Sequence, residues 1–291
     1  MIGLEGKVFA VTGAGNGLGR EYALLLAREG ARVVVNDLGG SRDGSGAGHS
    51  AADAVVEEIT AAGGEAVANY DTVATEAGGA AIVQTALDTW GRIDGLVANA
   101  GILRDTSFHK MTTAQWQAVV DVHLGGTYHV IRAAWPHLRE QGYGRIVVAT
   151  STSGLIGNFG QANYGAAKNG MVGLINTLAI EGRKFNIQVN AVAPLAATRM
   201  TEDVVPPDMF AAMPAEFVAP VVAQLLNEHC PDTGTVLVAG GGRVYRLQLF
   251  ENEGVRFDGI PSVEDVAANW DRITGMKDAV PAANPAVTVV K

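Results

Sequence analysis

The sequence predicts an α/β fold in which helices cover both faces of a parallel sheet. Short valine-rich runs alternate with helix-length segments along most of the 291 residues, as in successive βαβ units. A glycine-rich turn follows the first run, where such folds bind ligands. We therefore expect one doubly wound sheet of the Rossmann type, of about seven strands, with a ligand site beyond the carboxyl ends of the strands.

The expected elements follow from the length and residue types of each segment. Seven short apolar runs predict strands, and these are Lys7–Thr12, Arg32–Asp37, Glu65–Asn69, Gly95–Asn99, Arg145–Ser151, Gln188–Pro194 and Thr235–Ala239. Six longer segments predict helices, and these are Leu18–Glu29, Ser50–Ala62, Glu76–Trp90, Thr112–Arg139, Gln161–Arg183 and Ala215–Asn227. Residues 1–242 then form one dinucleotide-binding and catalytic domain.

Three segments interrupt the alternation. Residues 39–48 contain so many glycines that we expect a mobile surface loop. Residues 196–213, with two prolines and three methionines after a strand end, predict a lid over the substrate. Residues 243–291 predict an extension packed on the same domain, with a strand-like stretch, a capped helix from Ser262 to near Gly275, and frayed last residues.

The charge and the cysteine content of the chain limit which kinds of molecule it is expected to bind. A net charge of −9 opposes general binding to nucleic acid or anionic membranes, and no run of 18 uncharged apolar residues predicts a membrane span. The single cysteine, Cys230, excludes a disulfide framework within the chain and cannot by itself build a zinc site. We expect a cytoplasmic protein with a small-molecule substrate and no metal.

The glycine-rich turn predicts a phosphate-binding loop. Its residues Thr12-Gly13-Ala14-Gly15-Asn16-Gly17-Leu18-Gly19 lie between the first strand and the first helix. Glycines let the backbone approach a pyrophosphate, whose charge the amino end of the helix stabilises. We expect binding by Gly13, Asn16, Gly17, Leu18 and Gly19, the alternative being a turn that binds no ligand.

Asp37 predicts the cofactor as NAD. It ends the second strand, where a carboxylate can accept hydrogen bonds from both ribose hydroxyls and would repel a 2′-phosphate. Arg20 or Arg42 would reverse this preference by folding over the ribose, and Asp37 could alternatively only cap the following loop. The same rim carries further expected cofactor contacts after the third and fourth strands, namely Asp71, Thr72, Asn99, Ala100 and Gly101.

Tyr164 and Lys168 carry the clearest chemical signal, because residues four apart lie on one face of a helix. A free tyrosine has a pKa of about 10 and is a poor base until a nearby cation stabilises the phenolate. Lys168 and a cationic nicotinamide can do this. Ser151, at the end of the fifth strand, can hold the substrate oxygen, with Ser153, Thr150 and Thr152 as competitors.

Together these residues resemble the short-chain dehydrogenase/reductase family over residues 7–242. The resemblance implies an oxidoreductase in which Tyr164 is the general acid/base. It makes Lys168 the electrostatic partner and a ribose ligand, and Ser151 the holder of the carbinol oxygen. Pro194 would lie at the nicotinamide pocket, and Leu195 follows it where the family often has glycine.

Val35–Gly40, Ala100–Asp105, Gly157–Tyr164 and Leu178–Arg183 carry a narrower resemblance. They are similar to the (3R)-hydroxyacyl-CoA dehydrogenase domains of type 2 peroxisomal multifunctional enzymes, which are 17-beta-hydroxysteroid dehydrogenase type 4-like. This implies a 3-hydroxyacyl-CoA substrate. A hydroxysteroid dehydrogenase is the alternative, and a catalytically silent NAD-binding subunit is the alternative from another class.

One departure from the family concerns His123, which stands where many members have an asparagine. It could hold the water of a proton relay, or it could only pack in the helix.

The long helices of residues 112–139 and 161–183 imply, by the resemblance, a homodimer or homotetramer built on a four-helix interface.

Overall fold

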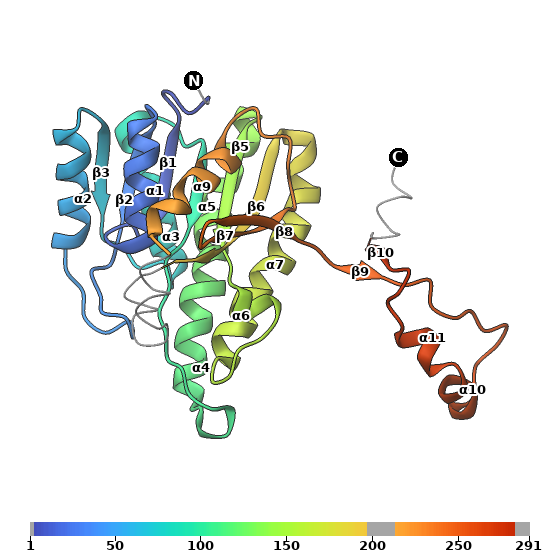
Figure 1. Cartoon of the computed structure of the whole chain (residues 1–291). Coiled ribbons are helices and arrows are strands. Elements are labelled where there is room, and N and C mark those ends of the chain that lie inside the picture. The colour runs from blue at the N-terminus through green and yellow to red at the C-terminus, as the bar shows by residue number, and fades with distance from the viewer. Residues whose placement is uncertain (1–2, 197–212, 283–291) are drawn as a thin grey trace. The chain divides into compact units, whose positions relative to one another are not determined.

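A central sheet organises the first part of the chain in the computed structural model, which describes residues 3–196 and 213–282 (Figure 1). The sheet has eight strands in the order β3-β2-β1-β4-β5-β6-β7-β8, and β1 to β7 pair in parallel. The strands are β1 Val8–Thr12, β2 Arg32–Asn36, β3 Glu65–Asn69, β4 Gly95–Ala98, β5 Gly144–Ala149, β6 Ile187–Leu195, β7 Val236–Gly240 and β8 Arg243–Leu247. The doubly wound parallel sheet and its seven expected strands are confirmed.

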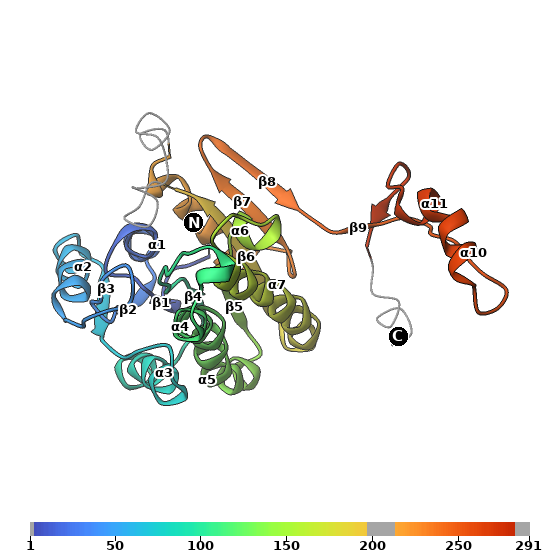
Figure 2. The ribbon, with the colours of Figure 1, turned by 90° about the horizontal axis from the view of Figure 1, so that it is seen from below.

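Helices cover both faces of this sheet (Figure 2). They are α1 Gly17–Arg28, α2 Ser50–Ala61, α3 Glu76–Trp90, α4 Thr113–Val120, α5 Gly126–Gln141, α6 Thr152–Leu155, α7 Ala162–Gly182 and α9 Ala219–Leu226. Strand side chains alternate between two cores, so that Phe9 and Val11 pack with α1, α2 and α9. Val8 and Ala10 pack instead with α3, α5 and α7.

The helix predicted over residues 112–139 is interrupted. It begins with a capping box between Thr112 and Gln115, and α4 then passes through a π-helical segment, Asp121–Gly125, into α5. A π segment adds a residue to a helical turn and is frequent at functional sites. Here it contains His123, which periodicity alone placed in a regular helix.

The extension after Gly242 divides differently from the prediction. Its first strand, β8, is the eighth strand of the sheet, and the chain separates into compact units at Arg246 and Leu247. The second unit has a two-stranded sheet, β9 Phe250–Glu251 with β10 Val280–Pro281, and two helices, α10 Val263–Ala268 and α11 Trp270–Thr274. The predicted cap is present, because Ser262 and Asp265 form a capping box. That this unit packs on the domain stays a prediction.

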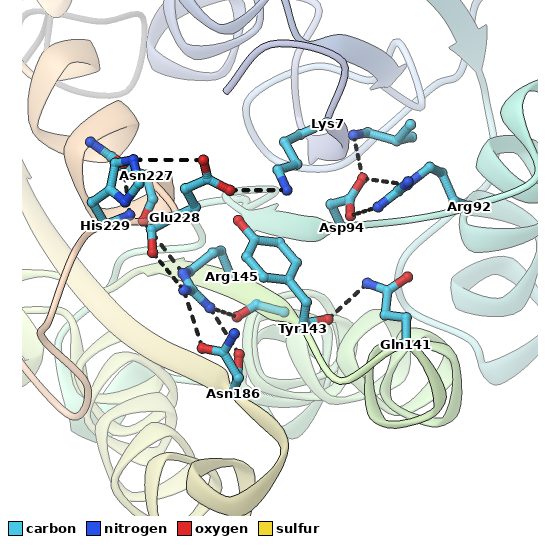
Figure 3. Close-up of polar contacts among 12 residues, drawn as sticks. Lys7, Arg92, Asp94, Gln141, Tyr143, Arg145, Asn186, Asn227, Glu228 and His229 are labelled. Atoms are coloured by element: carbon cyan, nitrogen blue, oxygen red, sulfur yellow. Dashed lines mark hydrogen bonds and ion pairs between the residues drawn. The ribbon is translucent and has the colours of Figure 1, made fainter. Parts of the chain in front are cut away.

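A network of hydrogen bonds and ion pairs joins the segments at the amino-terminal ends of the strands (Figure 3). Arg145 of β5 is almost fully buried and stacks on the Tyr143 ring, 4.4 Å from its centroid. Its guanidinium donates to the carbonyl oxygens of Gly144, Asn186, Asn227 and Glu228 and to Asn186 Oδ1. Since Asn227 and Glu228 follow the carboxyl end of α9, helix-end carbonyls help to stabilise this buried cation.

No helix within residues 3–196 and 213–282 combines the length and apolar character needed to cross a bilayer. The predicted substrate lid falls almost entirely on residues 197–212, and the frayed last residues on 283–291, both outside the described parts of the chain.

Candidate active site and dinucleotide cleft

The turn between β1 and α1 has the backbone that a phosphate-binding loop requires. Gly13 and Gly17 adopt positive φ angles of 65° and 52°. A Cβ on Gly19 would lie 2.1 Å from the Gly13 carbonyl oxygen, and one on Gly13 would lie 2.8 Å from Cα of Ala100. Glycine is therefore needed for the close approach of β1, α1 and the segment after β4.

The amino end of α1 suits an anion. Its first turn has no acidic side chain, and Asn16 makes no side-chain cap, so the first backbone N–H groups keep their capacity to donate to a phosphate. These features fit the pyrophosphate of a dinucleotide.

A cavity of about 450 Å³ lies along this edge of the sheet. Ten of the expected cofactor residues line it, and these are Gly13, Asn16, Gly17, Leu18, Asp37, Asp71, Thr72, Asn99, Ala100 and Gly101. The expected contacts Gly19, Pro194, Tyr164 and Lys168 are not part of this lining. Gly19 is buried in helix packing, and Pro194 lies within β6, opposite Ala239.

A second set of residues lines the cavity, and of these only Arg42 was expected near the cofactor. Arg104, Gly40, Ser41, Arg42 and Gly44 also line the cavity, so the 39–48 loop is a wall of the cleft rather than the surface insertion that its glycines suggested. Neither the loop composition nor any motif showed where the loop would fold. The structure gives it a defined hydrogen-bonded conformation.

Asp37 accepts hydrogen bonds from both neighbouring loops. Its Oδ2 accepts from Gly15 N at 2.8 Å, and its Oδ1 accepts from Gly39 N at 2.7 Å. The carboxylate is thereby fixed on the cavity wall, with lone pairs left on each oxygen for ribose hydroxyls. Arg20 does not fold over this position, because it forms ion pairs with Glu21 and Glu58.

The segments after β3 and β4 are held by their own side chains. Asp71 Oδ2 accepts from Asn69 Nδ2 at 2.8 Å. Asn99 Nδ2 donates to the carbonyl oxygens of Thr12 and Gly13, and Thr12 Oγ1 accepts from the backbone N–H of Asn99. Asn99 therefore holds the backbone of the glycine-rich turn in place, and Thr12 in turn holds Asn99. The position of these residues at strand ends did not show this supporting role.

Ser151, Tyr164 and Lys168 come together at the ends of β5 and α7. Ser151 is the N-cap of α6, where its Oγ accepts from Ser153 N at 3.2 Å, and its hydroxyl lies near enough to the Tyr164 phenol to lower the pKa of that group. Lys168 Nζ lies 5.5 Å from the centroid of the Tyr164 ring. Of the serine candidates, Ser151 is thus the one that meets the phenol.

Burial is the main cause of the pKa shifts in this group of side chains. Burial raises the pKa of Tyr164, and the hydrogen bond from Ser151 offsets this only in part. Lys168 Nζ donates to the Ala149 carbonyl oxygen, and burial lowers the pKa of Lys168 to about 7. That Lys168, together with a bound nicotinamide, lowers the pKa of Tyr164 stays a prediction.

His123 packs against Tyr164. The two rings meet edge to face with centroids 5.1 Å apart, and Nε2 of His123 lies 2.8 Å from the Ile102 carbonyl oxygen. Burial first, and then the Lys168 charge, lower the pKa of His123 to about 3. The ring is therefore neutral at physiological pH. Its Nδ1 is buried and has no hydrogen-bond partner among the described residues.

Asn163 is a positioning residue that the sequence analysis did not identify. It is fully buried, and its Nδ2 donates to the carbonyl oxygens of Arg104 and Gln115, both at 3.2 Å. Its Oδ1 accepts from Tyr164 N at 2.8 Å. An asparagine directly before Tyr164 at a helix start was the available signal.

Comparison with known proteins agrees with this geometry. Residues 7–208 match the family model for short chain dehydrogenases. A short-chain type dehydrogenase/reductase of Mycobacterium tuberculosis is 64% identical over 279 residues, covering 96% of this chain and 98% of the relative. The peroxisomal multifunctional enzyme type 2 of Mus musculus is 51% identical over 278 residues, covering 94% of this chain but 37% of that enzyme.

Solved structures extend the comparison. The full-length peroxisomal multifunctional enzyme type 2 of Drosophila melanogaster superposes with a TM-score of 0.82 at 40% identity, over 98% of this chain and 48% of that one. A 7α-hydroxysteroid dehydrogenase complexed with NADH and 7-oxo glycochenodeoxycholic acid gives a TM-score of 0.74 at 27% identity, over 83% of this chain and 95% of that one. The chain therefore belongs to the short-chain dehydrogenase family of oxidoreductases.

Proposed function

We propose that this oxidoreductase interconverts a (3R)-3-hydroxyacyl-CoA and the corresponding 3-ketoacyl-CoA with NAD as cofactor. The observation that carries the proposal is the grouping of three side chains: the Tyr164 phenol, the Ser151 hydroxyl that lowers its pKa, and the buried Lys168 one helical turn further along α7, with Nζ 5.5 Å from the Tyr164 ring centroid. A hydroxyl oxygen placed between a serine donor and a tyrosine acid/base is what carbinol oxidation and carbonyl reduction require.

In the proposed mechanism Ser151 donates a hydrogen bond to the substrate oxygen and holds it beside Tyr164. During reduction, the Tyr164 hydroxyl gives its proton to that oxygen, and during oxidation the phenolate takes it back. With its pKa raised, the Tyr164 phenol is protonated at neutral pH, which is the state that the acid role starts from. The bound nicotinamide supplies the site that exchanges hydride with carbon 3 of the substrate.

NAD is proposed over NADP because Asp37 is fixed on the cavity wall and Arg20, one of the two arginines that could reverse this preference, is held by Glu21 and Glu58. Arg42, the other, lines the cavity, and its effect on the preference is a question for the cofactor titration. A carboxylate at the position of Asp37 accepts ribose hydroxyls and repels a 2′-phosphate. A related dehydrogenase of known structure, described above, was solved with NADH.

The acyl-CoA substrate rests on similarity to the type 2 multifunctional enzymes. This chain spans 37% of the mouse enzyme, so only the portion matched here supports the proposal, and the other activities of those proteins are not inferred. A hydroxysteroid is the second candidate, favoured by the likeness to a 7α-hydroxysteroid dehydrogenase.

The test follows NAD reduction at 340 nm with matched panels of (3R)-3-hydroxyacyl-CoA esters and free hydroxysteroids. We expect turnover of the CoA esters, with Tyr164→Phe abolishing it and leaving NADH affinity nearly unchanged, because the change removes one oxygen and little cofactor surface. Turnover of steroids alone would favour the second candidate. Full activity of Tyr164→Phe would remove the proton-transfer role.

A homodimer or homotetramer is proposed from the long helices α5 and α7. Tyr128 on α5 and Ile180 on α7 are exposed to 50% and 46%, which is unusual for large apolar side chains on packed helices. Sedimentation velocity at micromolar concentration should show no monomer.

Since Cys230 is buried and has no partner cysteine, a reducing cytoplasm is the proposed compartment.

A further inference from the structure

The 39–48 loop leaves β2 through a narrow hydrogen-bonded base. Gly39 N donates to Asp37 Oδ1 at 2.7 Å, and Gly48 N donates to the Leu38 carbonyl oxygen at 2.9 Å. Gly39 has a φ of 74°, and a Cβ there would lie 2.0 Å from the Gly48 carbonyl oxygen. The two ends of the loop are therefore held together, which fixes the direction in which it projects.

Asp43 organises the tip of this loop. Its Oδ1 accepts from Ser41 Oγ at 2.6 Å, from Ser45 N at 3.0 Å and from Ser45 Oγ at 2.7 Å. These bonds hold the pKa of the Asp43 carboxyl well below its usual range. The tip is thus a compact turn built around a carboxylate, although its composition resembles a flexible glycine linker.

The tip meets the segment that follows β4. Leu103 N donates to the Arg42 carbonyl oxygen at 3.0 Å, and Arg104 Nε donates to the Asp43 carbonyl oxygen at 3.0 Å. A Cβ on Gly44 would lie 3.0 Å from Cγ2 of Ile102, so the Gly44 backbone lies close to the Ile102 side chain. Three contacts therefore join the loop after β2 to the segment after β4.

This connection passes over the dinucleotide cleft. In the sheet, β1 lies between β2 and β4, as Figure 2 shows, so a loop from β2 to the segment after β4 must cross the end of β1. The glycine-rich turn begins at that end. Gly13 and Gly17 line the cavity from β1 and α1, while Gly40 and Gly44 line it from the loop.

Arg104 also connects the loop to the catalytic helix. Its carbonyl oxygen accepts from Asn163 Nδ2, and Asn163 Oδ1 accepts from Tyr164 N. The residue that holds the loop tip is thus fixed to the first turn of α7. Arg104 therefore contacts both the loop tip, through its side chain, and the residue that bonds the Tyr164 backbone, through its carbonyl oxygen.

We propose that the 39–48 loop is a latch over the bound cofactor and that Arg104 is the positioning residue that keeps it closed. Cofactor entry and release then require the Arg104–Asp43 and Leu103–Arg42 hydrogen bonds to break. This inference rests on the dinucleotide site of the proposed function.

The experiment measures NADH release by stopped-flow fluorescence after displacement with excess NAD. Arg104→Gln removes the guanidinium, and Asp43→Ala removes the acceptor that orders the loop tip; we expect each to speed release by about tenfold, from the loss of one or more hydrogen bonds. The KM for NAD should rise in proportion. Arg28→Gln, on an exposed residue of α1, is the matched control and should release NADH as wild type does.

Arg104→Lys separates the latch from a simple effect of charge, since it keeps the cation but not the planar guanidinium that places an N–H on the Asp43 carbonyl. Fast release from Arg104→Lys supports the latch, and wild-type release from it overturns the latch in favour of charge. Unchanged release in both Arg104→Gln and Asp43→Ala overturns it as well. If the wild-type protein binds no NADH, the dinucleotide site itself is refuted; normal NADH binding with unchanged release refutes the latch alone.

Discussion

Gly101→Ala should damage both the stability and the activity of the enzyme through His123. A Cβ on Gly101 would lie 2.2 Å from Cε1 of His123, whereas ordinary contact begins at 3.4 Å, so the ring must move by about 1.2 Å. The ring is 1% exposed, held at Ile102 and packed on Tyr164, so it has no free space to enter.

The expected cost comes from overpacking and from the lost bond at Ile102. Forcing an extra methyl group into a packed core costs typically 1–3 kcal/mol, and a net hydrogen bond contributes about 1 kcal/mol. We therefore expect the free energy of unfolding to fall by about 2–4 kcal/mol. Since the displaced ring presses on Tyr164, kcat should fall by about tenfold or more.

Urea unfolding and kcat would be measured for Gly101→Ala, His123→Asn and the double variant. The smaller asparagine should leave room for the methyl group, so the double variant should be more stable than the sum of the two single effects by about 1 kcal/mol or more. Gly125→Ala is the control, because its Cβ would meet nothing closer than 3.6 Å. A Gly101→Ala protein as stable as wild type, or additive effects in the double variant, would refute the steric argument.

Three further predictions test the cofactor site, the strand-edge network and the buried lysine. Asp37→Ala should weaken NAD binding by about ten- to a hundredfold, because charged hydrogen bonds to the ribose are lost, and it should reduce the preference for NAD over NADP. Calorimetric titration with both cofactors checks this. An unchanged preference would mean that the ribose is recognised elsewhere. Arg145→Met should lower the free energy of unfolding by about 3 kcal/mol, because several buried carbonyl oxygens lose their donors. Arg28→Met, on an exposed residue of α1, should cost clearly less in the same urea titration, and equal costs would contradict the role given to burial. Burial lowers the pKa of Lys168 from 10.5 to about 7, so between these pH values the unfolded chain binds more protons than the folded protein and the contribution of Lys168 to stability grows as pH rises. Relative to Lys168→Met, the free energy of unfolding of wild type should therefore increase by about 1 kcal/mol per pH unit between pH 7.5 and 9.5. Parallel curves of stability against pH for the two proteins would show that the lysine titrates normally.

Much of the fold and part of the site could be predicted because their signals are local. Strands and helices follow from hydrophobic spacing over a few residues, and the glycine-rich turn lies between two such elements. Tyr164 and Lys168 share a helix face by their spacing alone, and Ser151 reaches them because parallel strands end at a common edge. All three assignments depend on neighbours within about one turn or one strand.

Contacts between distant segments could not be predicted in this way. The 39–48 loop has the composition of a flexible linker, yet it is ordered by Asp43 and held by Arg104, 61 residues further along the chain. Asn163 joins Tyr164 to Arg104 across 59 residues in the same manner.

The amino-acid sequence by itself determined the order of elements, the family and the chemical groups available, since these depend on residue type and short-range spacing. Tertiary structure alone decided how those groups behave. Burial raises the pKa of Tyr164, makes His123 neutral and brings the pKa of Lys168 near 7, because desolvation depends on what surrounds a side chain in space. The same three residues in an open chain would carry their ordinary charges.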